Sequence, residues 1–405
     1  MKNHELLIEK YQAYGKTLAP SIIKLRRHFH RNPEVGHKEF QTTSKLKNEL
    51  SKLGLQIFDG HAPTGLWAQL DTGKPGPVVA VRSDIDALPI EETSGLPYAS
   101  KIKGFSHACG HDVHMAVLVG TAKILSKFCD DLRGKVKFLC QPAEEVPPGG
   151  ANELIAAGVL KNPKVDAIVA LHDDPTLPVG HIGIRDGVTM AAVFDFDIVV
   201  IGCTGHAALP HKAIDAIAIA SHIITGLQQV VSRMVDPIDS VAISFGTIKG
   251  GTIRNGVAGE VYIEGTARSL SPSMTKKLPM IIKKAAVNIG RGLGAKVKFI
   301  PIAGYPLFES DARVNRFITD SYHRAYPKGK VHIVEKVLGA EDFASYLEIV
   351  PGAMFRLGVK NSAIGADKPW HHSSFTVDEN AIEVGFVTMA ATVTNLLYGW
   401  KGGKS

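Results

Sequence analysis

The sequence predicts an α/β protein in which a mainly parallel sheet is flanked by helices, with an inserted ferredoxin-like α+β domain. Three short β-rich runs alternate with longer helical stretches, which is typical of parallel strands joined by helical crossovers: Val78–Ser83, Lys135–Cys140 and Asp166–Leu171. The middle of the chain has the element order β-α-β-β-α-β, which is that of a split βαβ unit. With 405 residues, the chain has room for two or three domains of about 100–200 residues each.

The first part of the main domain is predicted to span residues 1–186. Apolar residues recur at helical spacing within residues 20–53, which predicts helix there. A second helical stretch covers Val113–Phe128. The three β-rich runs are expected to form the sheet against which these helices pack.

The insert is predicted to span residues 187–302. In chain order its strands and helices are expected at Phe194–Gly202, Ala213–Met234, Ser240–Ile248, Gly259–Ser269, Met274–Leu293 and Lys296–Ile302. The second part of the main domain, residues 303–405, then returns to α/β character. It is expected to contain a helix near Asp311–Tyr326 and a strand at Ala353–Val359.

The composition excludes several classes of protein. Apolar residues make up 45% of the chain and charged residues 21%, which excludes collagen, coiled coil and wholesale disorder. No apolar run approaches the roughly 18 residues of a membrane span, so no membrane partner is expected. Met1–Lys16 lacks the apolar core of a signal peptide, and the four cysteines are too few for a disulfide scaffold. We therefore expect a cytoplasmic location.

The charge of the chain is net basic, at +7 with a pI near 9.0. Its Lys and Arg residues are scattered, without the basic run that marks a nucleic-acid surface. We interpret the charge as a solvated surface and expect no nucleic-acid partner. Mild attraction of anionic substrates is the alternative.

The segment His107–His114 carries the strongest chemical signal in the sequence, with three histidines and a cysteine at the start of a predicted helix. Cys109 and His111, two residues apart, can both point at one metal ion, and the helix dipole there favours a thiolate. A Cys/His thiol nucleophile is the alternative chemistry. A helix-capping segment that is merely rich in histidine is the structural alternative.

Acidic residues and a histidine follow the three predicted strands. Asp84 and Asp86 follow the first strand, Glu144 and Glu145 the second, and His172 the third. Ligands of open α/β sheets bind beyond the carboxyl ends of the strands, so these side chains are expected to converge. Adjacent glutamates suit one metal ligand and one general base for water.

A loop near the C-terminus, Pro369–Ser374, adds His371 and His372. The predicted ligands combine soft and hard donors: Cys109, His111, Glu145, His172 and His371. Such a set suits one or two divalent ions of zinc, manganese, cobalt or nickel, and ligand type alone does not select among them.

Six segments together resemble one enzyme family. They read RHFHRNPE, RSDIDALPIEE, HACGHDVHMA, QPAEE, GHAALPH and LGAEDF, in this order along the chain. They resemble the M20 metallopeptidase family, and within it the branch of N-acyl-amino-acid amidohydrolases, which includes hippurate, indole-acetyl-amino-acid and aminoacylase-type hydrolases. The resemblance covers nearly the whole chain and implies a metal-dependent hydrolase domain with an inserted lid and dimerisation domain.

The resemblance also implies roles for residues of the main domain. Glu144 would be the general base for a metal-activated water. The implied metal ligands are Cys109, His111, Glu145, His172 and His371. Asp86 would orient a metal ligand by hydrogen-bonding that ligand rather than the metal.

Three positions depart from the pattern of this branch. Trp370 replaces a leucine in the loop that carries the last ligand, and His372 is a second choice for that ligand. Asp84 stands where the family's HxD motif has histidine. Asp173 and the residues after it replace an apolar or proline-containing segment, and no role follows for that change.

In the insert, the resemblance implies that His206 hydrogen-bonds the substrate carbonyl and stabilises the oxyanion. Capping of the following helix is the structural alternative for His206. Arg254, Asn255 and Arg268 are candidates for gripping a substrate carboxylate. An exposed sheet edge in the insert predicts a homodimer, in which His206 acts on its own or its partner's main domain.

The predicted function is metal-dependent hydrolysis of the amide bond of an N-acyl amino acid or a dipeptide-like substrate. A dipeptidase or carboxypeptidase is the alternative on the same scaffold. A thiol enzyme that uses Cys109, and a metal-dependent binding protein without turnover, are the alternatives from other classes.

Overall fold

The computed structural model describes residues 2–60 and 63–402 of the chain. It divides into two compact units. The first unit comprises residues up to Gly187 together with Glu309–Glu335 and the segment from Asp342 onward. The second comprises Val188–Phe308 and Lys336–Glu341. The second unit thus takes in residues 303–308 and 336–341 besides almost all of the predicted insert.

The first unit is built on an eight-stranded sheet with the strand order β1-β2-β4-β3-β5-β16-β6-β15. Its strands are β1 (Gln56–Asp59), β2 (Leu66–Asp71), β3 (Val78–Asp84), β4 (Lys135–Gln141), β5 (Ala167–Pro178), β6 (Ile182–Ile184), β15 (Val331–Ile333) and β16 (Gly352–Lys360). The central pairs β4–β3, β3–β5 and β5–β16 are parallel. The carboxyl ends of these four strands therefore lie along one edge of the sheet, as the sequence predicts.

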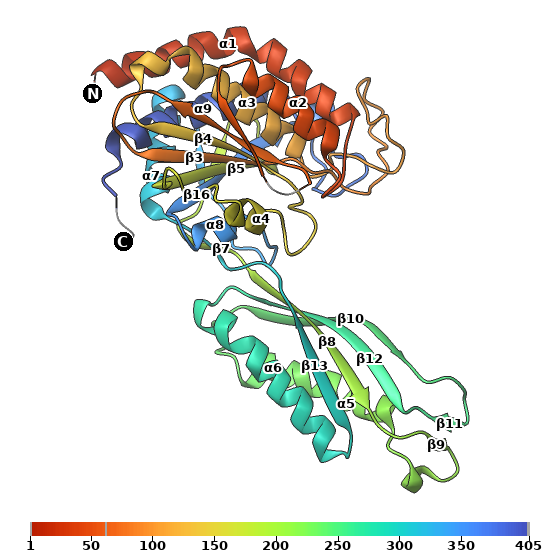
Figure 1. Ribbon diagram of the computed structural model, residues 1–405. Helices are drawn as coiled ribbons and strands as arrows, with labels where there is room; N and C mark the ends of the chain where they lie inside the picture. Colours follow the sequence, from red (N-terminus) through yellow and green to blue (C-terminus); the bar gives the residue numbers. More distant parts are fainter. Residues whose placement is uncertain (1, 61–62, 403–405) are drawn as a thin grey trace. The chain divides into compact units, whose positions relative to one another are not determined.

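Helices cover both faces of this sheet (Figure 1). They are α1 (Lys2–Arg31), α2 (Phe40–Ser51), α3 (His111–Lys127), α4 (Ala151–Ala156), α7 (Ala312–Ala325), α8 (Ala344–Leu347) and α9 (Asn380–Gly399). α1, α3 and α9 pack on one another over one face, and α4 and α8 lie on the other. Short 3₁₀ turns add η1 (Cys129–Asp131) and η3 (Ser362–Ile364). This architecture confirms the predicted fold class.

The helix predicted within residues 20–53 is two helices in the structure. α1 ends at Arg31 and α2 begins at Phe40. Pro33 explains the break, because a proline disfavours helical geometry at the residue before it and cannot donate a backbone hydrogen bond. The non-helical stretch between the helices carries Glu39, which bears on the candidate site.

β5 is longer than its β-rich run predicts, and this places His172 inside the strand rather than beyond its end. The run ends at Leu171, whereas β5 continues to Pro178. β16 pairs in parallel with β5, and Arg356 is opposite His172 in the register. A partner strand nearly two hundred residues away thus extends β5 through polar residues that the local pattern assigns to a loop.

The sequence does not predict α9 as an element, although it is a central helix of the first unit. It is long and apolar enough to cross a membrane, with a mean hydropathy of 1.3 over its best window. In the structure 83% of that window is buried, and α9 packs against α1, α3 and α7. We therefore assign α9 to the hydrophobic core of this unit.

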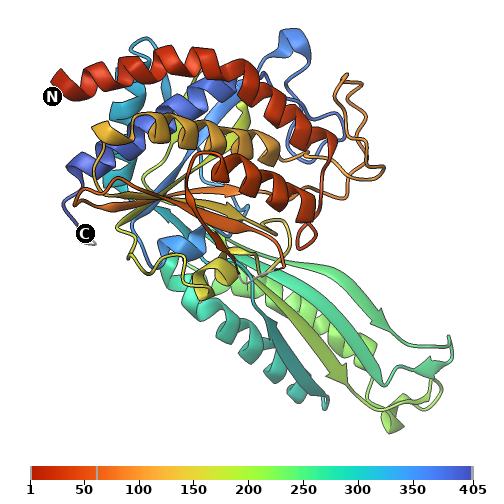
Figure 2. The same cartoon turned by 45° about the horizontal axis from the view of Figure 1, so that its top comes forward.

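The second unit is a four-stranded antiparallel sheet of order β10-β12-β8-β13, with two helices on one face (Figure 2). Its elements are β8 (Ala192–Ile201), α5 (Ala216–Arg233), β10 (Val241–Gly250), β12 (Glu260–Ser269), α6 (Pro272–Gly292) and β13 (Lys296–Ile302). Phe196, Ile198 and Val200 of β8 are buried beneath α5 and α6. The order and pairing are those of the predicted ferredoxin-like unit.

Smaller elements complete the second unit. A ribbon of β9 (Gly205–His206) and β11 (Gly256–Val257) is antiparallel, and η2 (Pro210–Lys212) follows β9. The chain passes between the units within β7 (Gly187–Met190) and β14 (Phe308–Ser310), and again on either side of Lys336–Glu341.

Candidate metal centre

The candidate ligands of the first unit come from segments that reach one edge of the sheet. α3 begins there at His111, preceded by Cys109 and Gly110. Gly110 has φ 80°, a left-handed conformation that glycine adopts without strain. This turn lets Cys109 and His111 both face His172 within β5.

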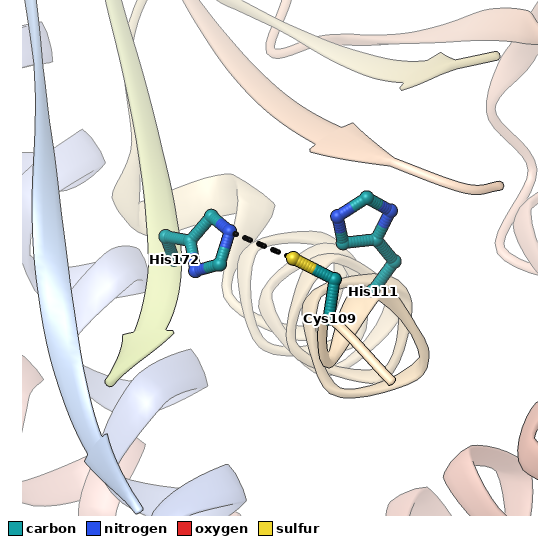
Figure 3. A group of neighbouring side chains, drawn as sticks. All are labelled: Cys109, His111 and His172. Carbon is teal, nitrogen blue, oxygen red and sulfur yellow. Dashed lines mark hydrogen bonds between the residues drawn. The ribbon is translucent and has the colours of Figure 1, made fainter. Parts of the chain in front are cut away.

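Cys109, His111 and His172 form a compact buried group (Figure 3). Their potential ligand atoms all lie within 4.8 Å of one another, and Cys109 Sγ is 3.7 Å from His172 Nε2. His172 Nδ1 donates a hydrogen bond to the carbonyl oxygen of Asp173 at 2.8 Å, so its Nε2 presents a lone pair to the group.

A second group shares the same cysteine and consists of Cys109, Glu145 and His371. His371 Nε2 lies 3.4 Å from Glu145 Oε1. The backbone N–H of His371 donates to the carbonyl oxygen of Ala108 at 2.8 Å, which ties the C-terminal loop to the segment before α3. The predicted ligands from four distant parts of the chain are thus brought together.

His372, the second choice for the last ligand, has a different environment. Both histidines are exposed, but His372 Nδ1 accepts a hydrogen bond from the backbone N–H of Ser374 at 3.0 Å, whereas His371 lies beside Glu145. The geometry therefore favours His371 over His372.

Asp86 contacts two of the candidate ligands. His111 Nδ1 lies 2.9 Å from the Asp86 carbonyl oxygen and 3.3 Å from its Oδ1. The backbone N–H of Glu145 donates to Asp86 Oδ2 at 2.9 Å. Fixing His111 Nδ1 as the protonated nitrogen turns Nε2 toward the group, which is how outer carboxylates orient histidine ligands.

Asp84 belongs to a buried ionic network next to the group of Cys109, His111 and His172. Arg82 Nη1 donates to Asp84 Oδ2 at 2.7 Å, and His114 Nδ1 is 2.6 Å from Asp84 Oδ1. Asp84 Oδ2 is 3.8 Å from His111 Nε2. Both carboxylate oxygens thus have cationic or histidine neighbours within the protein.

The ionisation of the candidate ligands in the metal-free protein follows from burial and neighbouring charge. Burial, reinforced by the charge of Glu145, raises the pKa of the Cys109 thiol well above its usual range. Burial lowers the pKa of His172 well below its usual range, so this imidazole is neutral. A neutral buried thiol does not have the activated thiolate of a cysteine nucleophile, and it ionises readily only beside a cation.

The hydrogen bonding of the candidate ligand atoms also fits a metal site. His111 Nε2 and Glu145 Oε1 are buried and, among the described residues, have no hydrogen-bond partner. Buried polar atoms without a partner are costly, so such atoms in a native protein call for an explanation. Ligands about 2.0–2.3 Å from one ion stand roughly 3–4 Å from each other. The 3.7 Å between Cys109 Sγ and His172 Nε2 and the 3.4 Å between His371 Nε2 and Glu145 Oε1 fall in this range. Thiolate, imidazole and carboxylate together suit a transition-metal ion.

Glu144 is 8% exposed and groups with His111 and Glu145 within 4.8 Å. The residue before it, Ala143, has a positive φ of 52°. The backbone N–H of Ala143 donates to Glu39 Oε1 at 2.8 Å, and Thr64 Oγ1 donates to Glu39 Oε2 at 2.6 Å. Glu39 therefore holds the turn that presents Glu144.

Glu39 is absent from the residues predicted from the sequence, because its carboxylate meets Ala143 only in the folded chain. It is fully buried, and burial raises its pKa to about 7, while the hydrogen bond from Thr64 partly offsets this effect. No local pattern distinguishes Glu39 from the other glutamates of the sequence.

The candidate residues of the second unit are placed apart from one another. His206 pairs with Gly256 in the β9–β11 ribbon, and the carbonyl oxygen of Asn255 accepts from the backbone N–H of Ala207 at 3.1 Å. His206 and Asn255 are therefore neighbours, with Arg254 exposed in the adjoining turn.

β12 begins at Glu260, shortly after the β9–β11 ribbon, and Arg268 lies at the other end of this strand. Its Nη1 donates to the carbonyl oxygen of Leu338 at 2.7 Å. Within the second unit, the structure thus does not bring Arg268 together with His206 and Asn255.

His206 has a defined tautomer when neutral. Its Nδ1 accepts a hydrogen bond from the backbone N–H of Ala208 at 3.0 Å. The ring proton then resides on Nε2, and the side chain is exposed. His206 is therefore a hydrogen-bond donor at Nε2.

Comparison with known proteins places these features in one family. Residues 80–395 match the model of peptidase family M20/M25/M40. An N-acetyl-L-cysteine deacetylase of Bacillus subtilis is 39% identical over 90% of this chain and 86% of its own length. Thermostable carboxypeptidase 2 of Saccharolobus solfataricus is 37% identical over 95% of this chain and 97% of its own.

A solved structure agrees with these relatives. The Bacillus subtilis YXEP protein, described as a dinuclear metal-binding peptidase of the M20 family, is 34% identical. It covers 95% of this chain and 99% of its own, with a TM-score of 0.82. The fold, the segments along its sheet edge and these matches agree, and the chain is a hydrolase that belongs to peptidase family M20/M25/M40.

Proposed function

We propose that this protein hydrolyses the amide bond of N-acyl amino acids with the help of one or two divalent metal ions. The observation that carries the proposal is the buried group of Cys109, His111 and His172, joined through Cys109 to Glu145 and His371. The relatives named as deacetylases supply the reaction type. A small substrate that carries an amide is common to the relatives of this chain.

The five candidate ligands would hold the metal, with Cys109 shared if two ions bind. When bound, the metal supplies Lewis acidity, which lowers the pKa of water and polarises an acyl carbonyl. Zinc, manganese, cobalt and nickel all suit this donor set. Two ions agree with the dinuclear description of the YXEP protein.

Glu144 is proposed as the general base. It lies beside the donors on a turn held by Glu39, and a carboxylate there can take the proton of an attacking water. The same carboxyl group can then return the proton to the leaving amine. Asp86 is a positioning residue, because it contacts His111 and Glu145.

His206 is proposed to donate a hydrogen bond from Nε2 to the oxyanion, and its tautomer supports this role. Asn255 and Arg254 are its neighbours and are proposed to bind the substrate carboxylate. Arg268 is proposed for the same task, although within its unit it lies away from the other three.

A homodimer formed through the second unit is part of the proposal. β10 and β13 are the edges of its four-stranded sheet. Both edges carry exposed isoleucines, Ile248 on β10 and Ile300 and Ile302 on β13, but β13 also contains Pro301, which blunts an edge. We therefore assign the dimer contact to β10, which would let His206 act on its own or its partner's first unit.

The four cysteines are all free, in agreement with the proposed cytoplasmic location. Because a relative is named as a carboxypeptidase, peptide hydrolysis is the second candidate function. A binding protein without turnover and a thiol enzyme are less consistent with the site, since Glu144 adjoins the donors and burial raises the pKa of Cys109.

The proposal is tested with N-acetyl, N-benzoyl and N-indoleacetyl amino acids and dipeptides, before and after metal removal with a chelator. We expect hydrolysis of one or more N-acyl amino acids, loss with the chelator and recovery on adding a divalent metal. Full turnover in the chelated protein, with loss on thiol alkylation, would instead establish the thiol enzyme. Hydrolysis of dipeptides alone would establish the second candidate function.

A further inference from the structure

We propose that Asp173 is a positioning residue that couples three of the four ligand-bearing segments of the metal centre, those of Cys109 and His111, of His172 and of His371, through one buried carboxylate. This inference rests on the proposed metal site. Asp173 follows His172 directly in β5 and is 0% exposed. Its contacts extend to the segment that carries Cys109 and His111 and to the loop that carries His371.

The first contact is with the turn between Cys109 and His111. A Cβ atom placed on Gly110 would lie 2.1 Å from Asp173 Oδ1. The carboxylate therefore packs directly against the Gly110 backbone, at a position where only glycine fits. The spacing between Cys109 and His111 is set by a turn that rests on Asp173.

The second contact is with the first turn of α3. Asp173 Oδ1 lies 3.0 Å from His114 Nε2, and His114 Nδ1 lies 2.6 Å from Asp84 Oδ1. His114 thus joins two buried carboxylates, and Arg82 anchors the second one. Such networks in a buried, low-dielectric setting resist distortion when every member has a partner.

The third contact is with the C-terminal loop. Trp370 Nε1 donates to Asp173 Oδ2 at 3.3 Å. The indole ring also packs edge-on against the His172 ring, with centroids 5.3 Å apart, and the Arg356 guanidinium lies 5.5 Å from the indole centroid. Trp370 immediately precedes His371, so this hydrogen bond positions the loop at its ligand.

The backbone of Asp173 completes the arrangement, because its carbonyl oxygen accepts from His172 Nδ1 at 2.8 Å. Asp173 and Trp370 are both positions at which the chain departs from the pattern of its branch, and in the structure they contact one another. One hydrogen bond therefore accounts for two departures that the sequence alone leaves unconnected.

Direct metal titration tests this inference, because its readout does not depend on turnover. Asp173→Asn removes the charge with little change in volume. We expect its affinity for Zn²⁺, measured by calorimetry, to fall about 10–100-fold, as is usual when a partner of a ligand is lost. We also expect the visible absorption of the Co²⁺-loaded protein to shift, since the geometry of the thiolate and imidazole ligands changes.

Asp174→Asn is the matched control. Asp174 is also buried, but within the part of the chain that the structure describes its Oδ1 accepts only from the backbone N–H and Oγ1 of Thr176. Its metal affinity and Co²⁺ spectrum should equal those of the unaltered protein. An equal loss in both variants would mean a general structural effect and would overturn the proposal.

Trp370→Phe provides the second arm, because it keeps an aromatic ring beside His172 and removes the N–H donor together with part of the ring volume. We expect a smaller loss of Zn²⁺ affinity than in Asp173→Asn and a shifted Co²⁺ spectrum. In the double variant the two losses should be less than additive. Strict additivity, or an unchanged affinity and spectrum in Trp370→Phe, would contradict the coupling, and this arm decides the matter if Asp173→Asn does not fold.

The result is separable from the amide-hydrolysis proposal. If the unaltered protein binds no Zn²⁺, the metal centre and this coupling both fail. If it binds Zn²⁺ with the expected differences among variants, the coupling holds whatever substrates are hydrolysed.

Discussion

The first unit holds three of its candidate metal ligands, Cys109, His111 and His172, in buried positions, whereas the second presents His206 exposed on a two-stranded ribbon. Cys109, His111 and His172 are 9%, 1% and 8% exposed, and each has fixed neighbours. Among the described residues, the His206 side chain has one hydrogen bond, which its Nδ1 accepts from the backbone N–H of Ala208. If the proposed roles are right, the site of the first unit is preorganised, whereas His206 would need another surface to cover it before it could act on a substrate.

Of the substitutions in the first unit, Cys109→Ala should have the largest effect on metal content and turnover. It removes the donor common to both ligand groups. Metal content and turnover should fall together, by more than the roughly 10–100-fold that loss of an outer partner costs. Elemental analysis and hydrolysis assays measure the two quantities. Cys203→Ala, at an exposed cysteine of the second unit, is the control and should leave both unchanged.

Glu144→Gln should separate metal binding from catalysis within the first unit. The substitution keeps the volume and removes the base, so metal content should remain while kcat falls by about 10²–10⁴-fold. Glu145→Gln should lose metal as well, because Glu145 belongs to a ligand group. An active Glu144→Gln protein, or equal metal loss in both variants, would contradict these assignments.

His206→Ala should lower kcat by about 10²–10³-fold, the usual cost of removing an oxyanion donor, with metal content unchanged. Mixing His206→Ala subunits with Glu144→Gln subunits then shows where His206 acts. Recovered turnover in the mixed dimer means action on the partner's first unit, since one site then has both groups intact. No recovery after confirmed subunit exchange means action within one chain, and a strictly monomeric protein refutes the dimer.

Glu39 gives the smallest expected effect, on stability rather than on the reaction. Burial raises its pKa from 4.5 to about 7, so between these pH values the folded protein binds more protons than the unfolded chain. The free energy of unfolding should therefore fall as pH rises through this window, by up to about 1.4 kcal/mol per pH unit from this group. Glu39→Gln should lose this contribution in urea unfolding from pH 4.5 to 7. Identical pH dependence in both proteins would show that Glu39 titrates elsewhere.

What the sequence predicts best is what is local. The run Val78–Ser83 is a strand, the stretch Val113–Phe128 is a helix that begins two residues earlier, and Lys296–Ile302 is a strand with the predicted bounds. The first two are mostly apolar runs and the third begins by alternating polar with apolar residues, and each pattern lies within the segment itself. The break at Pro33 is also a local signal, although the apolar spacing around it favours continuous helix.

What the sequence leaves out depends on contacts between distant segments. β5 runs past His172 because β16 pairs with it, and α9 is apolar nearly all round, so it lacks the one-sided periodicity of a surface helix. The candidate ligands stand in recognisable segments, but the residues that hold these segments in place do not. The roles of Asp173 and Glu39 arise only when the fold brings them to Trp370 and Ala143.

X-ray absorption at the metal edge of the reconstituted protein tests the central claim most directly. If the buried group of the first unit is the metal centre, Cys109 is a ligand, and the spectrum should contain a sulfur scatterer at about 2.3 Å together with nitrogen or oxygen scatterers at about 2.0–2.2 Å. The sulfur contribution should vanish in Cys109→Ala and persist in Cys203→Ala. A shell of nitrogen and oxygen alone in the unaltered protein would contradict the account.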